Sequence, residues 1–168
     1  MSVVGFLYSF LIYPIIFILP AWIANGTPVI FGGGKPLDMG KKLGGKPIFG
    51  KHKTLRGTLS GVIGGFIISV LELAFFNQAL AIGFALTIGA IVGDLIGSFI
   101  KRRIGVREGV SVAILDQYSF FVVALILAFP FGGLPNVVGL VVLIVLTGLL
   151  HRGTNVLAHK AKIKQVPW

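Results

Sequence analysis

The sequence predicts an all-α integral membrane protein with five transmembrane helices. Of its 168 residues, 55% are hydrophobic and only 12% are charged, and the mean hydropathy is +0.97. Soluble domains are usually about 45–50% apolar and about 25% charged. Five apolar runs are long enough to cross a bilayer, which takes roughly 20 helical residues. We therefore expect residues 1–168 to form a single membrane domain.

The expected spans in chain order are 3–24, 58–76, 79–100, 110–129 and 137–150. No Lys or Arg precedes the first span, and the run is longer than the apolar part of a signal peptide. It is therefore interpreted as a retained helix, which Pro14 and Pro20 should kink. Loops at 25–57 and 101–109 and a tail at 151–168 complete the chain.

The basic residues fall into three segments. Of the 15 Lys and Arg, seven lie between residues 26 and 57, four between 101 and 107, and four between 152 and 164. With five spans, the three segments lie on one side of the membrane. The positive-inside rule then places the N-terminus outside and the C-terminus in the cytoplasm. In a soluble protein a net charge of +10 would indicate nucleic acid; here we expect no nucleic-acid partner.

Two acids lie inside apolar segments, where a carboxylate is costly and is by default a functional-site hypothesis. At 1.5 Å per residue, Asp94 lies about 10 Å below the basic turn. Asp116 lies six residues into the next span, at about the same depth. The short turn makes these spans antiparallel neighbours, so the carboxylates can meet at a metal. The alternative is two separate buried acids, each neutralised by a base from a loop.

Mg²⁺ is the metal that the composition favours. The chain has no cysteine, so its ligands are oxygen or nitrogen atoms, which suit hard cations. Glu108 in the basic turn is either a third ligand or an exposed partner of Arg107. Glu72 lies near the outer end of the second span, where we expect it to reach outward or to bond a neighbouring helix.

The first loop is rich in glycine and in bases. Its nine glycines and three prolines argue against long regular structure. It is either a flexible solvated linker or an anion site, because glycine lets backbone N–H groups approach phosphate closely. The segment KHKTLRG leads directly into the second span, which puts Thr54 near a helix N-terminus. The spacing of the P-loop motif is absent.

The stretch SFIKRRIGVREG resembles the signature of the CDP-diacylglycerol synthase family. That signature has a Ser, then Lys-Arg, and four residues later Lys-Asp. LDQYS around Asp116 resembles a later segment of the family, although the His-Gly-Gly is missing and Ser119 stands where the family has another Asp. KHKTLRG looks like a shortened Lys-Thr-Gly element. Together with NGTPVIFGGGKPLDMGKK and the terminal VPW, these motifs make nearly the whole chain similar to the archaeal branch. The signature positions are Ser98, Lys101, Arg102, Arg107 and Glu108.

The resemblance implies a multi-pass cytidylyltransferase of the cell membrane, with its active site facing the cytoplasm. It would join CTP to digeranylgeranylglyceryl phosphate, an isoprenoid glyceryl ether phosphate lipid, and give CDP-archaeol and pyrophosphate with Mg²⁺ as cofactor. The implied catalytic residues are the basic side chains Lys101, Arg102 and Arg107, which would neutralise phosphates. The implied metal ligands are Asp94, Asp116 and Glu108. The implied substrate-binding residues are Asn25, Thr27, Lys51, Lys53, Thr54, Arg56 and Ser98.

A different class of function is also consistent with basic loops and intramembrane acids. A membrane transporter or binding protein for an anionic small molecule has the same needs. Transporters are often built from internal repeats with broken helices. Five spans without self-similarity argue against that class. The oligomeric state is left open.

Overall fold

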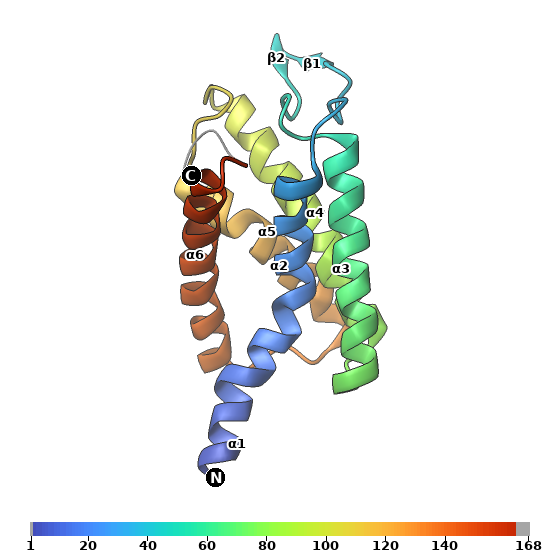
Figure 1. Cartoon of the computed structure of the whole chain (residues 1–168), viewed down its shortest axis with the longest axis vertical. Helices are drawn as coiled ribbons and strands as arrows, with labels where there is room; N and C mark the ends of the chain where they lie inside the picture. Colours follow the sequence, from blue (N-terminus) through green and yellow to red (C-terminus); the bar gives the residue numbers. More distant parts are fainter. Residues whose placement is uncertain (1, 164–168) are drawn as a thin grey trace.

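The computed structural model describes residues 2–163, and within them five helices are long and apolar enough to cross a membrane (Figure 1). This confirms the predicted fold class. The first helical rod comprises α1 (Val3–Leu7), a π-helical segment (Tyr8–Ile12) and α2 (Tyr13–Phe31). The others are α3 (Leu55–Phe76), α4 (Leu80–Arg103), α5 (Ala113–Ala128) with a 3-10 turn (Phe129–Phe131), and α6 (Val137–Lys160).

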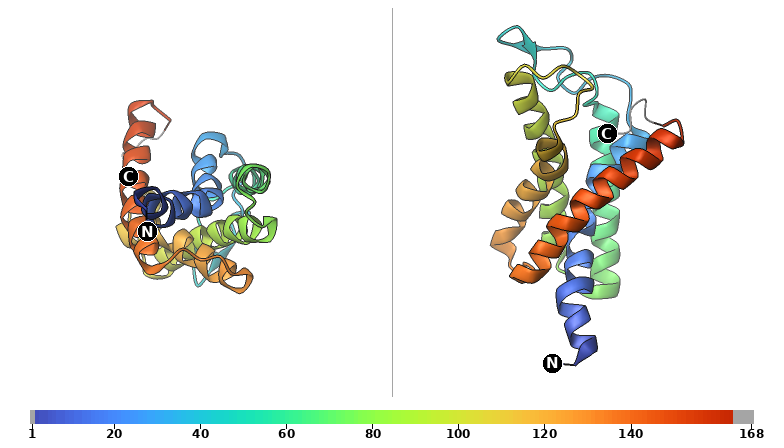
Figure 2. Two further views of the ribbon diagram at one scale, coloured as in Figure 1. Left: turned by 90° about the horizontal axis from the view of Figure 1, so that it is seen from below. Right: turned by 90° about the vertical axis from the view of Figure 1, so that its left-hand side faces the viewer.

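Three connecting or terminal segments gather at one end of the bundle. These are the loop from residue 32 to 54, the connection from 104 to 112, and the C-terminal end of α6 (Figures 1 and 2). The N-terminus and the short connections at 77–79 and 132–136 lie at the opposite end. The three basic segments are therefore on one side of the molecule, as the charge pattern predicts.

The first helix ends later than expected. It continues from Ala24 to Phe31, so the loop begins at Gly32 rather than at residue 25. Pro28 is accommodated inside the helix, although it has no N–H to donate to the Ala24 carbonyl. A Cβ added to Gly61 of α3 would lie 2.6 Å from that carbonyl oxygen, so α3 packs closely against the turn that Pro28 weakens.

The other helix ends also differ from the expected bounds. α4 continues through its basic residues to Arg103, where positive charge complements the helix dipole. α5 begins at Ala113, after an extended segment, rather than at residue 110. α6 runs to Lys160, so most of the predicted tail is helical. Residues 164–168 lie outside the described part of the chain.

Close packing of small residues joins the helices in pairs. On α4, a Cβ at Gly89 would lie 2.5 Å from the Ala124 Cα, and one at Gly93 would lie 2.4 Å from the Ser119 carbonyl oxygen. Such stripes let helix backbones approach in membranes, where association depends on van der Waals contact. The stripe on α4 faces α5, and a second stripe on α3 faces α2 and α4. They comprise Gly89, Gly93 and Gly97, and Gly57, Gly61 and Gly65.

Glu72 was predicted to reach outward or to bond a neighbouring helix, and both expectations are wrong. Its side chain is only 2% exposed. The Gln78 side-chain amide, in the connection between α3 and α4, donates to Glu72 Oε2 over 2.9 Å. The carboxyl group thus closes the turn after its own helix, at the end of the bundle opposite the basic loops.

Gly93→Ala should destabilise the bundle, because the new methyl group would meet the α5 backbone rather than a side chain that can move. Overpacking of this kind typically costs about 1–3 kcal/mol. Gly26→Ala is the matched control, since a Cβ there meets nothing within 4 Å and alanine favours a helix. Thermal unfolding in detergent, followed by circular dichroism, should show a lower midpoint for Gly93→Ala alone. Equal midpoints would contradict the packing described.

Candidate active site

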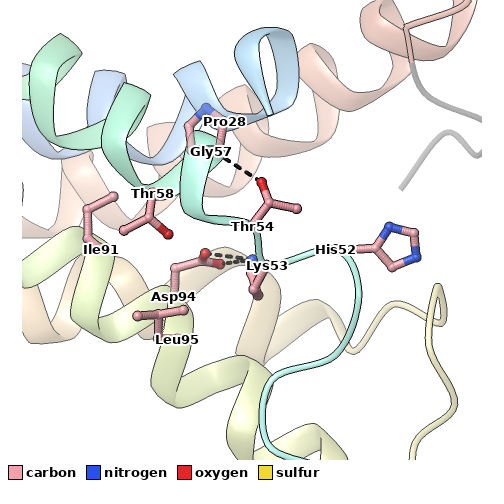
Figure 3. A pocket seen from close by; sticks show the side chains of 9 residues that line it. All are labelled: Pro28, His52, Lys53, Thr54, Gly57, Thr58, Ile91, Asp94 and Leu95. Carbon is pink, nitrogen blue, oxygen red and sulfur yellow. Dashed lines mark hydrogen bonds and ion pairs between the residues drawn. The ribbon is translucent and has the colours of Figure 1, made fainter. Parts of the chain in front are cut away.

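Lys53 reaches from the end of the first loop to Asp94 in the middle of α4. Its Nζ lies 2.7 Å from Asp94 Oδ1 and 2.5 Å from Oδ2, so both carboxylate oxygens accept from one ammonium group (Figure 3). Each side chain is about 30% exposed, at 28% and 30%. The pair therefore lies at a partly open site, and it joins two segments that are far apart in the sequence.

A second lysine–carboxylate pair lies between the end of α4 and the start of α5. Lys101 donates to Asp116 Oδ1, and the Ser111 hydroxyl and Val112 N–H donate to Asp116 Oδ2 over 3.0 and 2.9 Å. The Lys101 and Asp116 side chains are 13% and 21% exposed. Two of these three donors come from the segment that precedes α5, and the third comes from the last turn of α4.

The predicted meeting of three carboxylates does not occur in the described residues. They contain no group of three or more His, Asp or Glu side chains placed to hold a metal ion. Glu108 instead accepts from the Lys51 N–H at 3.2 Å, with Lys51 Nζ 3.9 Å away. The other expectation, that Glu108 is an exposed partner of Arg107, is not met either, because its carboxylate contacts Lys51. Asp94 and Asp116 each have a lysine of their own, which matches the alternative of separately neutralised acids.

Asp38 organises the loop that carries Lys53, and the sequence analysis did not single it out. Its carboxylate is 7% exposed. It accepts from the backbone N–H groups of Gly40, Phe49 and Gly50 at 3.0, 2.9 and 3.1 Å. Burial alone would raise the pKa of Asp38, but these N–H groups outweigh burial and hold the pKa below its ordinary value. A single acid within a basic, glycine-rich loop was the available signal.

Backbone hydrogen bonds connect the Asp38 segment to the Lys53 segment. The Leu37 N–H donates to the Lys53 carbonyl at 2.7 Å, and the Leu55 N–H donates to the Lys35 carbonyl at 3.1 Å. Lys53 and Leu55 are therefore both bonded to the stretch before Asp38. Its position depends on the fold of the loop.

Arg103 attaches the far part of this loop to α4. Its guanidinium donates to the carbonyls of Leu43, Lys46 and Pro47, which belong to the short antiparallel strands β1 (Lys42–Leu43) and β2 (Lys46–Pro47). Lys46 in turn donates to the Arg103 carbonyl at 3.0 Å. The loop is thus ordered, and the interpretation as a flexible linker is wrong.

The remaining predicted basic residues lie near the two lysine–carboxylate pairs, and they differ in how exposed they are. Arg102 is buried, at 7% exposed, and its Nη2 lies 3.4 Å from the Arg107 carbonyl, while its Nε has no partner among the described residues. Arg107, Lys51 and Arg56 are exposed. Arg102 is therefore held inside the α4–α5 connection, whereas the other three can reach a ligand in solution.

The other predicted substrate residues have more local roles. Thr54 is the N-cap of α3, and its hydroxyl accepts from the Gly57 N–H at 3.1 Å. Thr27 lies within α2, and its hydroxyl lies 3.0 Å from the Ile23 carbonyl oxygen and 3.2 Å from that of Ser60 on α3. Asn25 is half-buried in α2 and Ser98 is buried in α4. Asn25 and Thr27 were wrongly placed in the loop, because the helix continues past them.

A small polar cavity lies beside the Lys53–Asp94 pair. Its volume is about 40 Å³, and its lining includes Thr54, Thr58 and Ile91 (Figure 3). One water needs roughly 10–15 Å³ of such volume, so the cavity has room for a few waters or an ion but not for a nucleotide. A nucleotide would therefore have to lie above it, against the loops, with at most a phosphate or a metal at the cavity.

Comparison with known proteins agrees with the predicted resemblance. The CarS-like family, described as CDP-archaeol synthase, matches residues 7–168. The chain belongs to the CDP-archaeol synthase family. The synthase of Pyrococcus furiosus is 46% identical over 159 residues, covering 90% of this chain and 95% of that protein. The synthase of Methanopyrus kandleri is 44% identical over 156 residues, covering 90% of each.

A solved structure of an intramembrane enzyme for archaeal membrane lipids biosynthesis has the same fold. It is 41% identical with a TM-score of 0.76, and the match covers 84% of this chain and 92% of that chain. For a member of the CDP-archaeol synthase family, the two lysine–carboxylate pairs at the basic end of the bundle are the natural candidates for its active site.

Asp38→Asn should loosen the loop while the five helices stay folded. An amide nitrogen cannot accept, so at least one of the charge-assisted bonds, each worth about 1.5–3 kcal/mol, is lost. Amide hydrogen exchange at Phe49 and Gly50, followed by mass spectrometry at pH 7, should show reduced protection. Lys42→Gln, on the exposed strand β1, is the control.

The same loop should respond to acid. Because the folded-state pKa of Asp38 is below its unfolded value near 3.8, the carboxylate contributes its full stabilisation above pH 3.8. That contribution is lost as the pH falls through the lower folded-state pKa. In the wild-type chain, protection at Phe49 and Gly50 should therefore fall below pH 3.8, whereas Asp38→Asn should show no such step. An identical acid response in both proteins would sink this assignment.

Proposed function

We propose that the chain is a CTP-dependent membrane cytidylyltransferase that converts digeranylgeranylglyceryl phosphate to CDP-archaeol and pyrophosphate. Membership of the CDP-archaeol synthase family supports the reaction class. The observation that carries the proposal to particular residues is the clustering of two lysine–carboxylate pairs and several exposed bases at one end of five apolar helices. An amphiphilic phosphate and a highly charged nucleotide can meet only at such a boundary.

The reaction needs charge neutralisation more than proton transfer. A phosphate monoester is mostly dianionic at pH 7, since its second pKa is about 6, so its oxygen is already a nucleophile. That oxygen attacks the α-phosphorus of CTP, a new P–O bond forms, and the bond to the β-phosphate oxygen breaks to release pyrophosphate. Electrostatic stabilisation and positioning supply most of the acceleration in phosphoryl chemistry of this kind. Basic side chains are therefore the expected catalytic groups.

The structure supports distinct roles for these bases. Lys53 and Lys101 are proposed to contact phosphates at the reacting centre, since each already neutralises an anion there. Arg107 and Lys51 are exposed and are proposed to bind the outer phosphates of CTP. Arg102 is buried, so we propose that it fixes the turn and directs charge toward the same phosphates. Asn25 and Ser98 are not exposed, so their proposed role in substrate binding is indirect: they help to position α2 and α4.

The proposed cofactor is Mg²⁺, and the donor chemistry of Asp94 and Asp116 fits it. Both are carboxylates in a partly open site, and hard oxygen donors are what Mg²⁺ prefers. When bound, Mg²⁺ would withdraw charge from the triphosphate. Asp94 and Asp116 would hold the ion, and Lys53 and Lys101, which donate to these carboxylates, would lie next to it and could pair with phosphate oxygens. Glu108, held on Lys51, is not proposed as a ligand.

We further propose that the basic end of the bundle faces the cytoplasm, with the N-terminus outside. The support is that the 14 Lys and Arg among the described residues all belong to segments at that end, which the positive-inside rule places in the cytoplasm. CTP is available on that side of the cell membrane.

A turnover assay on the purified protein in detergent tests the reaction. Labelled CTP and Mg²⁺ would be given with digeranylgeranylglyceryl phosphate or with diacyl phosphatidic acid. We expect a labelled CDP-lipid from the ether substrate, and its loss on thorough chelation with recovery on adding Mg²⁺. Product from both lipids would keep the chemistry and remove the lipid specificity. No product from either would favour the alternative, an anion transporter or binding protein.

Substitution of the two carboxylates tests the residue assignment. Asp94→Asn and Asp116→Asn should each lower kcat/KM at least about 100-fold, the size typical for losing one electrostatic group at a charged transition state. Glu72→Gln is the matched control, because Glu72 is a buried carboxyl at the opposite end of the bundle. Circular dichroism and gel filtration would confirm that all three variants are folded. Near-wild-type turnover in either Asp variant would remove that residue from the site.

A further inference from the structure

A long groove runs down the outer side of the α2–α3 pair. Its volume is about 380 Å³, within the roughly 300–1,000 Å³ typical of sites for small molecules. The groove is open along its length, since Leu59, Ile63 and Ile67 of α3 are 60%, 51% and 53% exposed and Phe31 of α2 is 51% exposed. In a membrane-spanning helix pair, these side chains face lipid.

The floor of the groove is apolar because its polar atoms are satisfied. The Thr27 hydroxyl is within hydrogen-bonding distance of backbone carbonyls of α2 and α3, and the Ser60 hydroxyl donates to the Gly57 carbonyl at 2.8 Å. Gly64 supplies the depth, since a Cβ there would lie 2.9 Å from Thr27 Cγ2. The polar groups in the floor already have hydrogen-bond partners, so the floor suits a hydrocarbon chain better than a polar ligand.

The groove spans about one leaflet of a bilayer. It extends along α3 from Arg56, in the first turn, to Ile67. Eleven helical steps of 1.5 Å give about 16 Å. Half of the hydrocarbon core is about 15 Å thick, so a chain whose headgroup lies at the basic end would occupy the groove to near the bilayer midplane.

The one charged residue in the groove lies at its head end. Arg56 is exposed, and among the described residues its guanidinium makes no ion pair with a carboxylate. A guanidinium binds phosphate by two parallel hydrogen bonds. An apolar groove that ends in an unpaired arginine therefore matches an amphiphile with an anionic phosphate headgroup.

The groove and the polar cavity lie on opposite sides of the same helix end. Arg56, Leu59 and Ser60 line the groove, whereas Gly57 and Thr58 line the cavity beside Asp94. α3 begins at Leu55, so its own backbone does not extend past this turn. A phosphate held by Arg56 can therefore lie over the end of α3, with Lys53 and Thr54 on its other side, while its chain descends the groove.

We propose that this groove holds one hydrocarbon chain of the lipid phosphate substrate and that Arg56 binds its phosphate. This assignment rests on the proposed reaction, and it specifies where the lipid enters. It separates the two substrates: Arg56 and the outer α2–α3 face serve the lipid, and the loop and α4–α5 bases serve the nucleotide.

Steady-state kinetics on three variants test the assignment. Ile67→Trp should block the deep end of the groove and raise the KM for the long-chain lipid phosphate about tenfold, with the KM for CTP unchanged. With a short-chain dialkyl glyceryl phosphate the effect should vanish, because that chain does not reach Ile67. Arg56→Gln should raise the KM for both lipids about tenfold or more, as expected for losing charged hydrogen bonds. Leu73→Trp is the control, since Leu73 is 43% exposed and lies beyond the groove.

Two results would overturn the assignment. An unchanged KM for the long-chain lipid in Ile67→Trp would leave the groove without a substrate, and an increase in the KM for CTP alone in Arg56→Gln would place that residue with the nucleotide.

Photolabelling separates failure of this proposal from failure of the proposed reaction, since it needs no turnover. A dialkyl glyceryl phosphate with a diazirine in its chain should label the peptide 55–67 in wild-type protein, and less in Arg56→Gln. The same chains with a phosphocholine headgroup should label it weakly. Equal labelling by both probes would show a surface for bulk lipid and contradict the substrate site. Absence of product in the turnover assay, by contrast, would count against the reaction itself.

Discussion

The ion pair between Lys53 and Asp94 is the contact on which the rest of the site depends. A carboxylate within a membrane helix is expensive unless a partner neutralises it, and removing the partner of a buried pair leaves an uncompensated charge. The partner here comes from a loop 41 residues earlier in the chain. This one ion pair therefore joins the end of the loop to α4 directly before the start of α3, beside the polar cavity where these three elements meet.

Two features allow that contact to form. The glycine stripe on α4 brings α5 close, so Lys101 in the last turn of α4 reaches Asp116 in the first turn of α5. The Asp38 carboxylate gives the glycine-rich loop a core made of backbone hydrogen bonds, which substitutes for the apolar core that such a composition cannot build. Positive charge is thus held in place on both sides of the site by negative charge, from buried Asp38 in the loop and from partly buried Asp116 on α5.

The sequence was sufficient for the architecture because its signals are averages over many residues. Hydropathy over about 20 residues gave five spans, and the charge of whole segments gave their common end. Helix ends depend on single contacts, which explains why α2 continues past the predicted end at residue 24: a proline such as Pro28 normally ends a helix, but here Gly61 of α3 packs against the weakened turn. The repeats of glycine every fourth residue on α3 and α4 were visible in the sequence and would have indicated the two close helix pairs.

The sequence predicted which charged residues lie at the basic end of the bundle, but not how they pair. Depth along a helix correctly identified Asp94 and Asp116 as the carboxylates near the basic end. It could not show that Lys53 would reach one and Lys101 the other, because Lys53 depends on the loop fold around Asp38. The apolar groove was hidden for a related reason, since a lipid-facing leucine or isoleucine looks the same in sequence whether it lines a groove or a flat surface.

The opposite placement of cavity and groove has a consequence for how two unlike substrates can meet. CTP is soluble and polyanionic, so its binding groups must be polar and open to water, whereas a lipid chain must stay in an apolar medium. A helix that begins at the membrane boundary satisfies both conditions, because its side faces lipid while the positive end of its dipole and the neighbouring bases face anions. The first turn of α3, from Thr54 to Gly57, is where the two environments lie one helix diameter, about 10 Å, apart. Only the phosphate has to cross that distance, and the hydrocarbon need never leave the bilayer.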